Sequence, residues 1–360
     1  MRILVNALNA GNRSGTGRYI VELAKALLNS AGDDEFLFLW PENLPAPVLD
    51  KEFCLVRKSS SPASRLYYEH VGVDWLARTL RADIVHHPTG IGPRFSKTPV
   101  VLTVHDMCFF RHPDWFSRSR SFYYQYVMAA GIRKAVRIIA DSQATANNIM
   151  EIMAIPKSRI NVVPLGVDSC FTPASEEEIQ AIRRAYGLPA AFFLFVGTIE
   201  PRKNLARLVS AWRQVRSEVP PLVVAGRYGW GGSLPAGEDI IRLDHVPSAQ
   251  LPALYSAATA LVWPSLMEGF GLPPLEAMAC GTPVLTSSTS SLPEVAGDAA
   301  ILVDPLDVDA IASGMVALAR DAGLRSELRQ KGLKRAALYS WNETAKNTIA
   351  VFKQLLEGMR

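Results

Sequence analysis

Apolar positions along the chain alternate between two patterns. Short runs of consecutive apolar residues, such as 100–104 and 192–196, are typical of strands that are buried on both faces of a sheet. Small or polar residues follow these runs, and apolar positions at helical spacing come next, as after residue 204. This alternation predicts an α/β fold with parallel sheets. Further strands are expected at residues 3–8, 83–86 and 138–141, and a helix at 19–28.

The length of the chain and a break near its middle predict two domains. A chain of 360 residues exceeds what one hydrophobic core usually holds. At residues 163–168 an apolar strand is interrupted by Pro164 and Gly166, and we place the hinge there. The expected domains are residues 1–167 and 168–340, followed by a helical pattern from Trp341 to Leu356.

The most informative segment runs from Pro264 to Val284. Seven residues separate Glu268 from Glu276 and include a Gly-Phe-Gly turn, after which a segment with a helical pattern begins. The glycines allow backbone amides to face an anion, and a helix N-terminus favours a diphosphate. The carboxylate of Glu276 can accept hydrogen bonds from a ribose diol, while that of Glu268 can reach the hydroxyls of a sugar. Two glutamates beside a glycine turn are by themselves more often a helix N-terminal charge and a solvated loop.

A second segment favours a ligand site over a solvated loop. The buried strand pattern at 192–196 ends at Gly197, and Arg202 and Lys203 stand just before the next helix pattern. The planar guanidinium of Arg202 can hold phosphate oxygens, and Lys203 adds a compact charge. Together the two segments predict a site for a sugar nucleotide.

These segments also carry a family resemblance. VGTIEPRKNL, LYSAATALVWPSLMEGFGLPPLEAMACGTPV and SSLPEVAGDAAILVDP resemble the donor half of retaining glycosyltransferase family 4, and the resemblance extends over nearly the whole chain. It implies the GT-B architecture, in which two Rossmann-like domains face each other across an interdomain cleft. By the same resemblance, residues 1–167 bind the acceptor, residues 168–340 bind the donor, and the terminal helix (341–360) packs back on the first domain.

The resemblance assigns a role to each residue of the predicted site. Glu268 contacts the donor sugar, Glu276 the ribose, and Arg202 and Lys203 the diphosphate. Many members carry Arg directly after the strand-ending glycine, whereas this chain has Thr198, so the diphosphate is expected to depend more on Arg202 and Lys203. The predicted catalytic residues are His105, Arg202, Lys203 and Glu268. The predicted donor-binding residues are Gly15, Gly17, Gly197, Gly269, Phe270, Gly271, Leu272 and Glu276.

The first half of the chain contributes two of these predictions. Gly15 and Gly17 belong to a small-residue loop between a strand and a helix, where amides can meet a phosphate, although a flexible connection explains the glycines equally well. In the family this loop lies opposite the donor diphosphate. His105 follows the strand at 100–104, where ligands collect in such folds, and the family commonly has a sugar-contacting His here. His86 and His87 are expected in a loop after their strand.

No metal or cofactor is expected. Asp307 and Asp309 form the chain's only D-x-D pattern, and its position favours a helix cap over a metal site. No His or Cys cluster has zinc spacing. Cys54, Cys108, Cys170 and Cys280 are expected to be reduced, and an N-terminus without a signal-peptide layout predicts a cytoplasmic protein.

Charge is divided unevenly between the halves. Residues 1–167 hold 20 Lys and Arg against 14 Asp and Glu, net +6, whereas residues 168–360 hold 18 against 20, net −2. Within the basic half, residues 111–137 mix arginines with aromatic residues. This mixture fits peripheral docking on the anionic inner membrane face, or an amphipathic helix with buried aromatics and solvated arginines. Nucleic acid is not an expected partner, since no binding module is present.

The predicted function is transfer of a hexose, mannose first, from a nucleotide-diphosphate sugar to a glycan or lipid-linked oligosaccharide in cell-surface polysaccharide biosynthesis. GDP-mannose is the first expected donor and a UDP-sugar the second. A sugar-nucleotide epimerase of the same fold and a non-catalytic nucleotide-sugar-binding protein stay open. Hydride transfer is disfavoured because Ile20 replaces the third glycine of the dinucleotide fingerprint.

Overall fold

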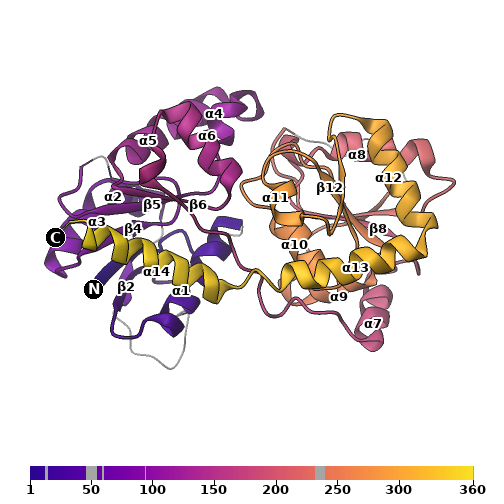
Figure 1. Ribbon diagram of the computed structural model, residues 1–360, viewed down its shortest axis with the longest axis horizontal. Helices are drawn as coiled ribbons and strands as arrows, with labels where there is room; N and C mark the ends of the chain where they lie inside the picture. The colour runs from indigo at the N-terminus through magenta and orange to yellow at the C-terminus, as the bar shows by residue number, and fades with distance from the viewer. Residues whose placement is uncertain (13–14, 46–54, 59–60, 94, 232–239, 360) are drawn as a thin grey trace. The chain divides into compact units, whose positions relative to one another are not determined.

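The chain forms two compact units. The computed structural model describes residues 1–12, 15–45, 55–58, 61–93, 95–231 and 240–359. The first unit comprises Met1–Gly166 and Ser340–Arg360, and the second comprises Val167–Tyr339 (Figure 1). The chain passes from the first unit to the second after Gly166 and returns after Tyr339, in each case one residue before the boundary expected from the sequence.

A seven-stranded parallel sheet forms the centre of the first unit. Its strand order is β3-β2-β1-β4-β5-β6-β7. Strands β2 and β3 are added on one side of β1 and strands β4 to β7 on the other, so the order of the strands reverses between β1 and β4. Leu4 of β1 lies opposite Leu37 of β2 and Val85 of β4, and all three side chains are buried. The strands are β1 (Arg2–Asn6), β2 (Glu35–Pro41), β3 (Leu55–Lys58), β4 (Ile84–His87), β5 (Val100–Val104), β6 (Arg137–Ala140) and β7 (Ile160–Val162).

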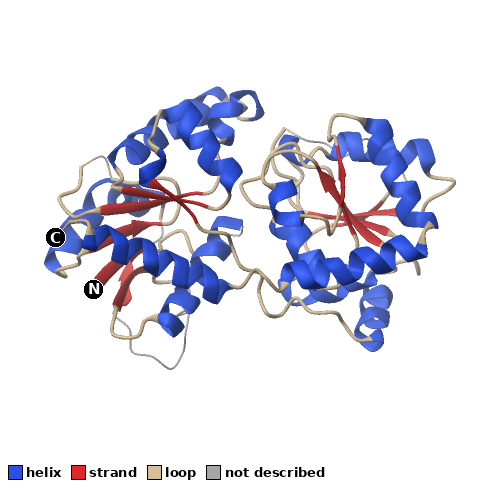
Figure 2. Ribbon diagram, viewed as in Figure 1, coloured by secondary structure: helices blue, strands red, loops and turns tan. Residues whose placement is uncertain are grey.

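Helices cover both faces of this sheet (Figure 2). The helix that returns from the second unit, α14, lies beside α1, and its Phe352 ring contacts His86 of β4. Short 3₁₀ turns occupy Pro113–Trp115 and Lys157–Arg159, and a π-helical turn spans Tyr68–Gly72. The α-helices are α1 (Gly15–Ser30), α2 (Pro62–Tyr67), α3 (Val73–Thr79), α4 (Cys108–Arg111), α5 (Arg118–Lys134), α6 (Gln143–Met153) and α14 (Trp341–Glu357).

The second unit repeats this architecture with six parallel strands. Their order is β10-β9-β8-β11-β12-β13, and the reversal falls between β8 and β11. The strands are β8 (Phe193–Val196), β9 (Leu222–Ala225), β10 (Ile241–Leu243), β11 (Ala260–Trp263), β12 (Val284–Ser287) and β13 (Ile301–Val303). The helices are α7 (Glu176–Tyr186), α8 (Leu205–Val215), α9 (Leu251–Ala257), α10 (Leu272–Ala279), α11 (Leu292–Ala296), α12 (Val308–Arg320) and α13 (Ala322–Ala336), with 3₁₀ turns at Pro201–Lys203 and Ser248–Gln250.

Of three local predictions from the sequence, the structure changes two and confirms one. Helix α1 begins at Gly15, four residues before the expected start, because the segment 15–18 already winds into its first turn. His86 and His87 are the last residues of β4 and are fully buried, so the expected loop is wrong there. Asp307 is the N-cap of α12, and its Oδ1 accepts from the amides of Asp309 and Ala310 at 2.9 Å, as expected.

Other expectations concern thiols and membranes. Among the described residues, Cys108, Cys170 and Cys280 form no disulfide, while Cys54 lies outside the described residues. Within the described ranges, none of the helices combines the length and the apolar character that crossing a bilayer requires.

Candidate active site

The loops that carry the predicted residues leave neighbouring strands at the point where the sheet of the second unit reverses. One loop follows β8 and contains Arg202 and Lys203, and the other follows β11 and contains Glu268. In open parallel sheets, ligands bind outside the carboxyl ends of the strands at such a reversal. The topology therefore brings together side chains that are more than sixty positions apart in sequence.

Two glycines allow backbone segments to come close together at the ends of β8 and β9. Gly197 ends β8 with φ +154°, and a Cβ there would lie 2.7 Å from the Trp263 ring. Gly226 follows β9 with φ +152°, and a Cβ there would lie 1.9 Å from the carbonyl oxygen of Gly197. Gly197 thus has a packing requirement of its own, besides the donor-binding role expected from the sequence.

A tight turn presents the two cations. Arg202 and Lys203 lie in the 3₁₀ turn that ends at Asn204, which takes a left-handed conformation with φ +60°. The Asn204 side chain donates to the carbonyls of Pro264 (2.9 Å) and Pro305 (2.6 Å), and so ties this turn to the loop after β11. Asn is among the few residue types that adopt this conformation readily, which explains its place after the cations.

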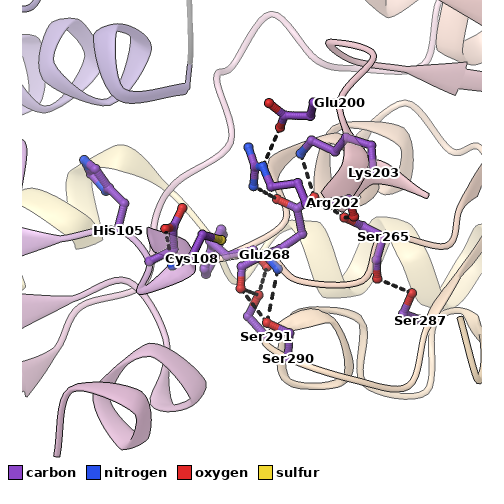
Figure 3. A network of polar contacts seen from close by, with 12 residues as sticks. His105, Cys108, Glu200, Arg202, Lys203, Ser265, Glu268, Ser287, Ser290 and Ser291 are labelled. Atoms are coloured by element: carbon purple, nitrogen blue, oxygen red, sulfur yellow. Dashed lines mark hydrogen bonds and ion pairs between the residues drawn. The ribbon is translucent and has the colours of Figure 1, made fainter. Parts of the chain in front are cut away.

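Glu268 joins both cations in one buried cluster (Figure 3). Arg202 donates to its Oε2 at 2.9 Å, and Lys203 donates to its Oε1 at 2.6 Å. A second carboxylate, Glu200, is buried and pairs with the Nε of Arg202. The Lys203 ammonium also lies 4.7 Å from the centre of the Trp263 ring, a cation–π arrangement.

The electrostatics of the cluster follow from burial and pairing. Burial by itself raises the pKa of the Glu268 carboxyl, but the Lys203 and Arg202 charges outweigh it and lower that pKa to about 2. Burial and the neighbouring Arg202 charge lower the pKa of Lys203, against the opposite effect of Glu268 and Glu200. Glu268 is therefore an ionised carboxylate at any physiological pH.

Serine side chains hold the backbone around Glu268. Ser290 accepts from the Glu268 amide at 3.1 Å and donates to the Glu268 carbonyl at 2.6 Å. Ser291 lies within hydrogen-bond distance of the carbonyls of Glu268 (3.0 Å) and Phe270 (2.6 Å). Ser265 lies 2.6 Å from the Glu268 carboxylate, and Ser287 donates to the Ser265 carbonyl at 2.6 Å. The peptide at Glu268 is thus fixed on both sides, while its side chain ends among charges.

Helix α10 carries the rest of the predicted donor-binding segment. Gly271 is its N-cap with φ +119°, and the helix begins at Leu272, whose side chain is half-buried. Gly269 and Phe270 are buried ahead of it, and the Phe270 ring packs edge-on against Tyr339 at 5.6 Å. Glu276 lies in the second turn, where its Oε2 accepts from the Tyr255 hydroxyl at 2.9 Å.

His105 is held at both ring nitrogens in the first unit. Its Nδ1 lies 2.7 Å from Asp141 Oδ2, and its Nε2 lies 3.0 Å from the Pro88 carbonyl oxygen. The Tyr19 ring packs edge-on against it at 4.7 Å. Burial lowers the pKa of His105, but Asp141 and the Pro88 carbonyl outweigh it, so the pKa is raised. Both ring partners accept hydrogen bonds, which favours the doubly protonated imidazolium.

Gly15 and Gly17 differ in their surroundings. Both lie in the first turn of α1. A Cβ on Gly17 would lie 1.8 Å from the carbonyl oxygen of Asn12, whereas a Cβ on Gly15 would meet nothing within 4 Å. Gly17 is therefore required by the turn that precedes the helix. Arg13 and Ser14 of the same predicted loop lie outside the described residues.

Several residues of the site were not singled out in the sequence. Ser290 and Ser291 belong to a run of three serines and a threonine directly after β12, and such a run at a strand end was the available signal. Glu200 and Asp141 also stand at or just after strand ends. Tyr255 carries no local signal, because its role depends on how α9 packs beside α10.

Comparisons with known proteins agree with this architecture. Residues 178–335 match the family model "Glycosyl transferases group 1", and residues 13–171 match "Glycosyltransferase Family 4". The O-antigen chain mannosyltransferase B of Escherichia coli is 34% identical over 78% of this chain and 77% of that protein.

Solved structures share the fold at lower identity. A sucrose-phosphate synthase from Thermosynechococcus elongatus superimposes with a TM-score of 0.77 at 20% identity, over 99% of this chain and 100% of that one. The Anabaena protein HepE in complex with UDP-glucose gives 0.75 at 17% identity, over 98% and 100%. With its two Rossmann-like units of the GT-B fold, the chain belongs to the family 4 glycosyltransferases.

Proposed function

We propose that the protein is a retaining hexosyltransferase that moves mannose from a nucleotide-diphosphate sugar to a glycan or lipid-linked oligosaccharide during cell-surface polysaccharide synthesis. The observation that carries the proposal is the cluster of Arg202, Lys203 and Glu268 at the sheet reversal of the second unit. Two cations beside a carboxylate suit a ligand that joins a diphosphate to a hydroxyl-rich sugar. The mannosyltransferase relative favours mannose, and with it GDP-mannose.

Each residue has a chemical task in this proposal. Departure of the diphosphate develops negative charge, which Arg202 and Lys203 stabilise from fixed positions. The carboxylate of Glu268 accepts hydrogen bonds from the hydroxyls of the transferred sugar, and Glu276 does the same for the ribose. The amides at the start of α10 face the diphosphate. His105 contributes a charged ring toward the sugar, with Asp141 maintaining its protonation.

A donor panel tests this function. GDP, UDP and ADP with their mannose and glucose conjugates are screened by thermal shift, since a ligand at 100 times its dissociation constant adds about 2.7 kcal/mol of stability. Turnover of the preferred donor is then followed by nucleotide release with oligosaccharide acceptors, with and without chelator. We expect acceptor-dependent release of nucleotide that the chelator does not reduce. A strict magnesium requirement would remove Arg202 and Lys203 as the charge-neutralising groups.

Two other functions give different results in the same assay. An epimerase converts the sugar nucleotide without an acceptor, and a binding protein shows a thermal shift without turnover. Retention is tested by the anomeric configuration of the product in NMR spectra.

A further inference from the structure

The Glu268 carboxylate is bound to the two cations that the proposed function assigns to the diphosphate. Arg202 and Lys203 reach opposite oxygens of its carboxylate, at 2.9 and 2.6 Å. All three side chains are largely shielded from solvent, with 7% of the Glu268 side chain exposed, 8% of Lys203 and 23% of Arg202. A diphosphate that binds Arg202 and Lys203 must therefore replace the Glu268 carboxylate as their ionic partner.

The charges within the cluster balance one another. Glu200 and Glu268 carry two negative charges, and Arg202 and Lys203 carry two positive ones. A nucleotide diphosphate adds further negative charge to this balance. Once it binds the cations, Glu268 is left as a buried carboxylate that has lost its ionic partners, which is a costly state unless other donors replace them.

Glu268 cannot avoid this cost by moving its backbone. Ser290 binds its amide and its carbonyl, and Ser291 lies close to the same carbonyl, so only the side chain can rotate. Ser265, at 2.6 Å from Oε1, supplies one hydroxyl donor. Among the described residues, Arg202, Lys203 and Ser265 are the donors to this carboxylate, so we expect further donors to come from the ligand. The hydroxyls of a sugar attached to the diphosphate can supply them, and a nucleotide diphosphate without the sugar cannot.

We propose that Glu268 makes the site discriminate between the nucleotide-diphosphate sugar and the nucleotide diphosphate, by yielding its two cations only when sugar hydroxyls replace them. This inference rests on the proposed function. The donor satisfies both the cations and the carboxylate. After the sugar has been transferred, the product satisfies the cations alone, and Glu268 competes with the diphosphate for them and speeds product release.

Binding measurements on three forms of the full chain test the proposal. Calorimetry gives the dissociation constants of GDP and GDP-mannose, or of the pair selected by the donor panel, without acceptor. In Glu268→Gln, we expect the preference for the sugar conjugate over the free diphosphate to fall by at least about tenfold, the scale of a hydrogen bond to a charged group. The fall should come mainly from tighter binding of the free diphosphate.

Glu200→Gln is the matched control. It removes a buried negative charge from the same Arg202, and among the hydrogen bonds described the Glu200 carboxylate makes none to the Lys203 side chain. We expect it to tighten both ligands to a similar degree and to leave the preference unchanged. A preference that is unchanged in Glu268→Gln, or that falls equally in Glu200→Gln, overturns the inference.

A second measurement uses the unmodified protein and tests the role of Glu268 even if Glu268→Gln does not fold. Free mannose at high concentration should tighten GDP binding, because its hydroxyls replace the cations around Glu268, and GDP should tighten mannose binding by the same factor. Independent binding of the two overturns the inference while leaving the proposed function intact. Failure of the unmodified protein to bind any nucleotide overturns the proposed function, and the inference with it.

Discussion

At the scale of single residues, the site is defined by charged groups that compensate one another. Lys203 is enclosed by the Glu268 carboxylate and the Trp263 ring, and Glu276 is oriented by the Tyr255 hydroxyl. Neither lysine nor glutamate is normally buried without such partners. The burial of Lys203 and Glu276 is therefore explained by these partners, a carboxylate and a ring for the lysine and a hydroxyl for the glutamate.

Removing either group should disable the donor site. We expect Lys203→Ala to lower kcat by about a hundredfold or more, the loss typical of one group that stabilises transition-state charge. Glu276→Ala should mainly raise KM for the donor. Steady-state kinetics with the preferred donor measure both. Lys331→Ala is the control, since Lys331 also pairs with two carboxylates but is more exposed; wild-type turnover in Lys203→Ala and Glu276→Ala would refute the site.

The protonation of His105 gives a second prediction at this scale. Asp141→Asn removes the carboxylate that raises the pKa of His105, so burial should then lower that pKa below the usual value of about 6.5. NMR titration of the ring measures the change. In the unmodified protein, the stability that His105 contributes is complete below about pH 6.5 and is lost as pH rises through the raised pKa. An unchanged titration in the variant would mean that Asp141 does not control the ring.

The sequence indicated the identity of these residues better than their contacts. Glu268, Glu276, Arg202 and Lys203 stood out because glycines and a helix start flanked them. The ion pairs that Glu268 makes with Arg202 and Lys203 could not be predicted, because they depend on how the loops after β8 and β11 approach each other. The unusual conformation of Asn204 has the same origin.

At the scale of elements, apolar runs located the strands well. The expected strand at 100–104 is β5 without change, and that expected at 138–141 is β6 shifted by one residue. Runs of buried apolar residues determine such strands by themselves. The sequence predicted the start of α1 four residues too late. Gly15 and Gly17 weaken the helical pattern in the sequence, although the chain is helical at these residues. His86 and His87 were misplaced because polar residues in a buried strand end resemble a loop.

The two glycines of α1 should respond differently to substitution. Gly17→Ala places a Cβ against the Asn12 carbonyl, and we expect it to lower the free energy of unfolding by about 2 kcal/mol or more. Gly15→Ala is the matched control in open space and should be neutral or slightly stabilising. Urea denaturation monitored by fluorescence measures both. Equal effects would show that the close approach at Gly17 can relax.

At the scale of the whole molecule, the second unit contains both carboxylates, the arginine and the lysine that are proposed to bind the donor. Arg202, Lys203, Glu268 and Glu276 all lie within Val167–Tyr339. We expect a fragment of residues 167–339 to fold and to bind the nucleotide selected by the donor panel, but not to transfer sugar. Thermal shift and calorimetry on the fragment check this. Loss of nucleotide binding in a folded fragment would show that the first unit contributes to the donor site.

The membrane hypothesis also belongs to this scale. In the predicted basic segment the structure divides the aromatic residues: Tyr124 stacks on Phe109 at 4.4 Å, whereas Phe122 and Tyr126 are exposed. If the exposed rings and nearby arginines dock on an anionic surface, Phe122→Ser should reduce sedimentation of the protein with anionic vesicles. Added salt should also reduce the sedimentation of the unmodified protein with these vesicles. Equal sedimentation with neutral and anionic vesicles would eliminate the hypothesis.

The return of α14 to the first unit has a consequence for synthesis of the protein. Phe352 and Leu355 of this helix are buried within the first unit, so the apolar side of α1 that α14 covers stays uncovered until the ribosome has translated Trp341–Glu357. The second unit is continuous in sequence and needs no later residues. Domains usually mature in the order of translation, from the N-terminus onward. Here the segment made first is completed last, and it is the one that requires protection while the chain is still growing.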